Sequence, residues 1–248
     1  MEILSIRLRS ISSTQDWLRD WARMQAREGI ILQAREQTAG RGRLNHTWES
    51  ATGGLYLSVL LRPRIPLPQA QKLTMMVSLA AIDACTEVAS VTPRPKWPND
   101  LLLGRKKLAG VLTELESDGP TLRYAIIGLG LNVNNDFSGS PLADIATSLK
   151  QATGRSHSIN ALAEAFARAL QRRYAHLHAG AAVHHAWAQD LEPLGRQVTV
   201  LRPNQKPLHG LAYGVSPAGA LLVRDTTGGK HIIWAGDVVV NWDNQLFE

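Results

Sequence analysis

The 248-residue chain is long enough for one large domain, or for a large domain and a small one. Hydrophobic residues make up 44% of it and charged residues 19%, a balance that excludes a disordered or fibrous protein. The single cysteine, Cys85, excludes an internal disulfide and a cysteine-cluster metal site. No apolar run approaches the roughly 20 residues that span a bilayer, and the N-terminus lacks a secretory signal. We therefore expect a cytoplasmic protein with no membrane partner.

The net charge of +6 raises the question of a nucleic-acid partner. The notable basic residues form short clusters within glycine-rich or apolar sequence, at residues 41–43 and 105–107. They form neither a long basic tail nor a recognition helix. This pattern favours small anionic ligands such as phosphates over a nucleic-acid duplex.

The first half of the chain predicts alternating helices and strands. Hydroxyl residues at 12–14 precede an apolar stripe at helical spacing, which indicates a helix start. Residues 29–34 and 54–61 are typical of buried strands. Residues 69–88 lack glycine and proline and predict a long, mostly buried helix that includes Cys85. Three strands at 94–97, 108–115 and 122–130 suit an antiparallel meander.

The texture of the sequence changes after a second amphipathic helix predicted at 159–177. Short strands then follow one another between turns, at 198–201, 208–215, 220–223, 232–234 and 238–240. We therefore predict an α+β fold with two domains, residues 1–191 and 192–248. The first has a mixed or antiparallel central sheet flanked by helices, and the second is a small β-barrel.

Three segments carry polar and glycine residues suited to ligand binding. Gln37–Arg43 alternates glycine with arginine, so backbone amides and two guanidinium groups can hold a phosphate or a carboxylate. Lys96–Asp100 places Asn99 and Asp100 on a turn after a strand, and the following hairpin returns Lys107 and Gly110 to the same place. Gly128–Asn134 has two glycines inside an apolar strand, which favours close approach of a ligand.

Taken together, these motifs resemble the biotin protein ligases, or biotin–[acetyl-CoA-carboxylase] ligases. The resemblance is carried by Ser13-Thr14, Gln37–Arg43, Trp48, Lys96–Asp100, Lys107–Gly110 and Gly128–Asn132, in matching order and spacing from about residue 10 to 135. The segments at 214–223 and 234–238 resemble the SH3-like C-terminal domain of that family.

The resemblance implies that the chain forms biotinyl-5′-AMP from biotin and ATP and then transfers biotin to one lysine of a biotin carboxyl carrier protein. ATP and Mg²⁺ are then required. The implied catalytic residues are Lys107, Arg43 and Asp100, the last either as a Mg²⁺ ligand or as the acceptor of the target lysine's proton. The implied biotin-binding residues are Ser13, Thr14, Gln15, Gln37, Gly40, Arg41, Gly42, Arg43, Lys107 and Gly110. The implied ATP and adenylate contacts are Arg41, Arg43, Trp48, Asn99, Lys107 and Asn132.

The chain departs from the family pattern in the glycine–arginine loop, where Asn45-His46 replaces the usual Gly-Arg. It also starts directly at the catalytic region, so we expect a ligase without the DNA-binding domain of the bifunctional members and without specific DNA binding. A homodimer through the central sheet is frequent in the family. The alternatives are a lipoate ligase or acyltransferase of the same fold and, in another class, a basic nucleic-acid-binding module.

Overall fold

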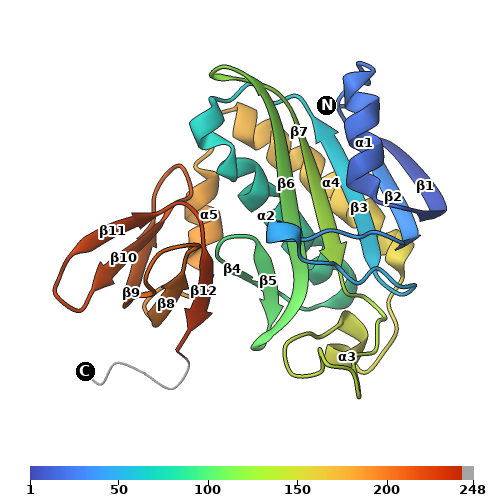
Figure 1. Ribbon diagram of the computed structural model, residues 1–248. Coiled ribbons are helices and arrows are strands. Elements are labelled where there is room, and N and C mark those ends of the chain that lie inside the picture. The colour runs from blue at the N-terminus through green and yellow to red at the C-terminus, as the bar shows by residue number, and fades with distance from the viewer. Residues whose placement is uncertain (242–248) are drawn as a thin grey trace.

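The computed structural model describes residues 1–241 (Figure 1). A seven-stranded mixed sheet in the order β1-β2-β3-β7-β6-β5-β4 forms the larger unit. Only the β1–β2 pair is parallel, and every other neighbouring pair is antiparallel. The strands are β1 (Leu4–Ile11), β2 (Ile30–Gln37), β3 (Leu55–Leu61), β4 (Arg94–Lys96), β5 (Asp100–Leu103), β6 (Lys106–Asp118) and β7 (Thr121–Leu131).

Helices cover both faces of this sheet. The long helices α2 (Gln71–Ala89) and α4 (Ile159–His178) pack together on one face, where residues such as Leu55, Val59 and Ile127 form the main core. Helix α1 (Thr14–Arg23) lies on the other face, over a smaller core that includes Leu32, Leu60 and Ile126. Because side chains alternate along a strand, neighbouring residues of the same strands supply the two cores. The predicted mixed sheet flanked by helices is confirmed.

Helix α1 begins as the sequence predicts and brings polar residues to the middle of the sheet. Ser13 is the N-cap, and its Oγ accepts from the Asp16 amide at 3.5 Å. The first-turn residues Thr14 and Gln15 are buried although both are polar. Short helices complete the larger unit: η1 (Arg43–Asn45), η2 (Leu67–Gln69), α3 (Leu149–Thr153) and α5 (Val183–Gln189).

The C-terminal unit is a five-stranded antiparallel sheet in the order β11-β10-β9-β8-β12. Its strands are β8 (Gln197–Leu201), β9 (Leu208–Val215), β10 (Leu221–Asp225), β11 (Lys230–Ile233) and β12 (Asp237–Val240), close to the predicted positions. Within the described residues β11 and β12 pair on one side only, so the strand pairing describes a sheet with two edges, where the sequence predicts a barrel.

The C-terminal sheet lies beside the β4–β5 end of the main sheet (Figure 1), and the apolar core continues from one unit into the other. Polar contacts also join this end to Gly219 of the C-terminal unit and to Glu192, which precedes β8. The buried indole Nε1 of Trp97 donates to the Gly219 carbonyl at 3.0 Å. The Glu192 amide donates to the Pro95 carbonyl at 2.8 Å, and its buried carboxylate pairs with Arg94 at 3.0 Å. Burial of a charge is tolerated here because the guanidinium compensates it.

Candidate active site

A cavity of about 380 Å³ opens on the α1 face of the main sheet, where three parts of the fold meet. The start of α1 and strands β3, β6 and β7 form its floor, the segment 41–48 covers one side, and β12 of the C-terminal sheet forms another wall. A pocket of this size that combines apolar walls with convergent polar groups is typical of small-molecule sites.

Uncharged polar groups line the end of the cavity beneath α1. Thr14 donates from its amide to Gln37 Oε1 at 2.8 Å, and its hydroxyl lies 2.7 Å from Ser58 Oγ. The Gln15 side chain donates to the Leu112 carbonyl at 3.2 Å and passes over Gly128, where a Cβ would lie 2.7 Å from its Oε1. These hydroxyl and amide groups suit a neutral polar ligand such as a urea.

The opposite end of the cavity is charged, and the register of the sheet explains its layout. Lys96 pairs with Asp100, Asp100 with Gly110, and Gly110 with Gly130. Residues directly opposite one another on neighbouring strands point to the same face of a sheet. The row therefore places two charged side chains on β4 and β5 beside a bare, glycine-lined floor on β6 and β7.

A β-bulge turns Lys107 into this row. Leu101 pairs with Ala109 but Leu102 pairs with Lys107, so one extra residue of β6 lies between these pairs. Lys107 then lies on the side of Gly110, where a Cβ would be 3.4 Å from its Cε. Its Nζ is 2.7 Å from Asp100 Oδ1. The ion pair holds the ammonium group at the cavity wall.

Trp48 lies across the two glycines. A Cβ on Gly130 would lie 2.4 Å from Trp48 Cε2, and one on Gly110 would lie 3.1 Å from Cζ3. The Lys107 ammonium is 5.3 Å from the indole ring, within cation–π range. The indole Nε1 is buried without a hydrogen-bond acceptor among the described residues, so a ligand acceptor there would satisfy it.

The two arginines of the loop point to different partners. Arg41 Nη2 pairs with Asp16 at 2.8 Å and with Glu114 at 2.9 Å, outside the charged row. Arg43 donates to Asn99 Oδ1 at 3.2 Å and to the Gly236 carbonyl at 3.2 Å. It also pairs with Asp237 of β12 at 3.3 Å, and so links the loop, the main sheet and the C-terminal sheet.

The cavity gathers most residues that the sequence singles out. Those lining it are Ser13, Thr14, Gln15, Gln37, Arg41, Gly42, Arg43, Trp48, Asn99, Asp100, Lys107 and Gly110. Gly40 and Asn132 are not among the lining residues. Gly40 packs tightly, since a Cβ there would lie 2.4 Å from Ser50 Oγ, and the buried Asn132 donates to the Thr147 carbonyl at 3.0 Å.

Several lining residues are assigned no ligand contact of their own from the sequence. Lys96 belongs to the predicted ligand-binding segment at 96–100, Ser58 lies on a predicted strand, and Asp237 and Val239 come from the C-terminal sheet. The signal for Ser58 is a polar residue inside an apolar strand, at a position that faces α1. Single-sequence patterns carry no signal that β12 folds back onto the cavity.

The charged row does not provide a protein-held Mg²⁺ site. Asp100 Oδ1 is already 2.7 Å from the Lys107 ammonium, which would repel a divalent cation. Within residues 1–241 no three His, Cys, Asp or Glu side chains come together in a way that could hold a metal ion. The same part of the chain contains no helix both long and apolar enough to cross a membrane.

Sequence and structure comparisons agree on one group of relatives. The profile of the biotin/lipoate A/B protein ligase family matches residues 8–132, and that of the biotin protein ligase C-terminal domain matches residues 194–240. The bifunctional ligase/repressor BirA of Bacillus subtilis is 35% identical over 228 residues, which cover 90% of this chain and 70% of the relative. The biotin–[acetyl-CoA-carboxylase] ligase of Paracoccus denitrificans is 31% identical over 83% of this chain and 88% of its own length.

A solved structure extends the likeness over both units. The biotin protein ligase from Aquifex aeolicus, in complex with biotin and ATP, superposes with a TM-score of 0.82 at 29% identity. The superposition covers 95% of this chain and 97% of the other. The two sheets and their order along the chain are therefore shared with that protein.

Proposed function

Because the chain belongs to the biotin/lipoate A/B protein ligase family, we propose that it joins biotin and ATP into biotinyl-5′-AMP and then transfers biotin to a lysine of a carrier protein. The observation that carries this proposal is the change from uncharged polar groups to charged groups along the cavity. Uncharged hydroxyl and amide groups at one end suit the ureido ring of biotin, and the charged row at the other end suits a carboxylate and phosphates.

The first step requires positive charge where two anions meet. A carboxylate oxygen of biotin attacks the α-phosphorus of ATP, the bond from that phosphorus to the bridging oxygen breaks, and pyrophosphate leaves. Lys107 in the charged row is placed to stabilise the charge that gathers in the transition state, and Arg43 adds a second cation to the same cavity. Asp100 orients the Lys107 ammonium through their 2.7 Å ion pair.

The second step is aminolysis of the mixed anhydride. The amine of the target lysine attacks the biotinyl carbonyl carbon, the bond from that carbon to the phosphate oxygen breaks, and AMP leaves. The amine loses one proton in this step. Asp100, the cavity-lining carboxylate beside Lys107, can accept it once the lysine has moved from this carboxylate to the anhydride phosphate.

Magnesium belongs to this proposal only as the ion that accompanies the ATP phosphates. The pairing of Asp100 with Lys107 does not fit a resident metal. The proposal also includes a carboxyl carrier domain of acetyl-CoA carboxylase as partner, cytoplasmic location, division into domains 1–191 and 192–248, and no specific DNA binding. A carrier partner follows from the ligase chemistry, because the adenylate needs an acceptor amine.

Biotin-dependent exchange of labelled pyrophosphate into ATP tests the proposal. We expect exchange with biotin and none with lipoate or octanoate, since hydroxyl and amide groups line the end of the cavity where an acyl chain would need apolar contacts. Exchange with lipoate alone would show the alternative member of the family. Absence of exchange with every acid would refute the proposal.

Lys107→Ala should slow biotin-dependent exchange at least about a hundredfold, because loss of one transition-state charge donor costs roughly 3 kcal/mol. The matched control is Lys106→Ala on the same strand. The Lys106 ammonium donates to the Ala143 carbonyl at 2.6 Å, and Lys106 is not among the cavity-lining residues. Near wild-type exchange by the Lys107 variant would remove the role given to this lysine.

A further inference from the structure

Lys96 differs from the other cationic residues of the cavity wall. Arg41, Arg43 and Lys107 each pair with at least one carboxylate. Lys96 also lines the cavity, half-buried, but within residues 1–241 its ammonium has no carboxylate or hydrogen-bond partner. Its charge is the one on the cavity wall that no carboxylate compensates among the described residues, which points to an anion supplied by a ligand.

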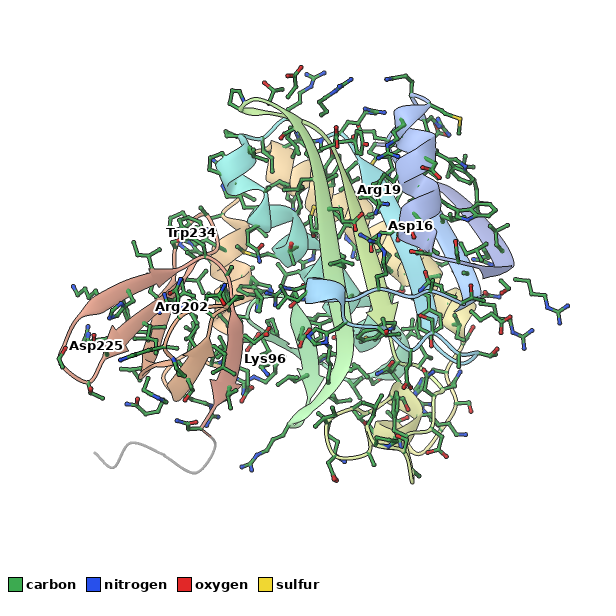
Figure 2. The ribbon with its side chains drawn as sticks, in the orientation of Figure 1. Asp16, Arg19, Lys96, Arg202, Asp225 and Trp234 are labelled. Carbon is green, nitrogen blue, oxygen red and sulfur yellow. The ribbon has the colours of Figure 1, made fainter. Side chains whose placement is uncertain are left out.

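The position of Lys96 indicates which anion this is. It lies on β4, directly across from Asp100 on β5, and therefore one strand beyond the Lys107–Asp100 pair. Adjacent strands are about 4.8 Å apart, so Lys96 extends the charged row beyond the point where the carboxylate and the α-phosphate react. Figure 2 shows Lys96 between the end of the main sheet and the C-terminal sheet.

The balance of charge at this end also favours a polyanion. Three cationic side chains, Arg43, Lys96 and Lys107, line this end of the cavity together with two carboxylates, Asp100 and Asp237, while Arg41 is compensated by carboxylates outside it. Each of these carboxylates is already bound to one cation, Lys107 or Arg43. Biotin carries a single negative charge, and so does the adenylate, in which the carboxylate is bonded to phosphorus, whereas the leaving pyrophosphate carries several.

We propose that the Lys96 ammonium binds the β- and γ-phosphates of ATP and stabilises the pyrophosphate that leaves in the adenylation step. This inference rests on the proposed ligase function and adds one substrate-binding residue to it. Lys96 then acts only while pyrophosphate is present. It should matter for adenylation and its reversal, and not for transfer of biotin from a finished adenylate to the carrier.

Lys96→Met tests this, because methionine keeps much of the length of the side chain and removes the charge. We expect the KM values for ATP and for pyrophosphate in the exchange reaction to rise at least about tenfold, while the Kd for biotin stays within about twofold. Lys96→Arg should keep most of the wild-type behaviour. Lys106→Met is the matched control, since that lysine lies on the neighbouring hairpin outside the cavity lining.

Two further measurements separate failure of this inference from failure of the proposed function. Transfer from added biotinyl-5′-AMP to the carrier lysine should proceed at the wild-type rate in Lys96→Met. Calorimetric titration of pyrophosphate onto the unliganded protein needs no turnover and should show weaker binding by Lys96→Met than by Lys106→Met. Equal pyrophosphate affinity in the two variants would overturn the assignment of Lys96, even if the wild-type protein showed no exchange. The assignment would also be overturned if Lys96→Met slowed transfer from added adenylate as much as it slows adenylation.

Discussion

Arg41 is a cation on the cavity wall whose charge is already compensated. Its guanidinium pairs with Asp16 at 2.8 Å and with Glu114 at 2.9 Å, and Arg19 pairs with the same two carboxylates (Figure 2, Asp16 and Arg19). Two cations and two carboxylates therefore form one network at the edge of the site. The two carboxylates weaken the electrostatic attraction between the Arg41 guanidinium and a phosphate bound in the cavity. The family resemblance implies that both loop arginines contact biotin and the adenylate, and it gives a catalytic role to Arg43 alone.

We therefore expect Arg41→Gln to slow biotin-dependent exchange by less than about tenfold, far less than loss of Lys107. Arg19→Gln is the matched control, because Arg19 shares both carboxylates and is not among the cavity-lining residues. The two variants should have similar exchange rates and similar small losses of stability. A hundredfold slower Arg41 variant beside a normal Arg19 variant would show that Arg41 acts on the substrate.

The identities of the site residues were predictable, and their partners were not. Ser13, Thr14 and Lys107 could be chosen because their motifs occur at fixed spacings, and they do line one cavity. The bulge that turns Lys107 toward Asp100 depends on strand register, which a single sequence does not specify here. Asn132 was predicted at the nucleotide, but its amide is occupied by the Thr147 carbonyl.

At the scale of elements, the two glycines on β6 and β7 create the floor on which Trp48 lies. They pair with each other across the strands, and both lack the Cβ that would meet the indole. A glycine inside a strand weakens it, so a pair at matching positions indicates a need for space. The sequence showed each glycine, but not that Gly110 and Gly130 are neighbours.

Gly130→Ala should disrupt this packing, because the new Cβ would lie 2.4 Å from Trp48 Cε2. Overpacking of this kind costs about 1–3 kcal/mol of stability, so we expect a lower melting temperature. Because Trp48 must also leave its place on the cavity floor, we expect exchange to be at least about tenfold slower. Gly214→Ala in β9 is the control, since its Cβ would meet nothing closer than the Leu222 methyl at 3.5 Å. Equal exchange rates for the two variants would contradict the role of the glycine floor.

Helices and strands were predictable from the sequence where the buried residues recur with the period of a helix or of a strand. The long helices α2 and α4 and all five strands of the C-terminal sheet appear close to their predicted positions. Strands β1 and β5 were not predicted as strands. The alternation of apolar and polar residues from Leu4 to Arg9 is typical of a strand and could have identified β1, which is an edge strand and largely exposed. Strand β5 has only four residues, three of them consecutive leucines, and shows no alternation.

For the whole molecule, the functional consequence of the two-unit arrangement is that the C-terminal sheet completes the charged end of the cavity. Asp237 and Val239 of β12 line that wall, and Arg43 reaches across to Asp237 and to the Gly236 carbonyl. The uncharged end lies beneath α1 and receives nothing from the C-terminal sheet among the described residues. The two ends should therefore respond differently when the units are loosened from each other.

Trp97→Phe loosens them at one buried contact, because phenylalanine keeps an aromatic ring but loses the Nε1 bond to the Gly219 carbonyl and part of the buried indole. An orphaned buried carbonyl costs about 1–3 kcal/mol, so the melting temperature should fall by a few degrees. The KM for ATP should rise by at least about tenfold, while the Kd for biotin stays within about twofold.

Thr14→Val is the complementary variant at the other end of the cavity, since it removes the hydroxyl that lies 2.7 Å from Ser58 at the uncharged end. That variant should weaken biotin binding by at least about tenfold and leave the KM for ATP unchanged. Calorimetry with biotin and exchange kinetics at saturating biotin measure the two quantities. If both variants raised both constants alike, the C-terminal sheet would serve overall stability and not the ATP end of the site.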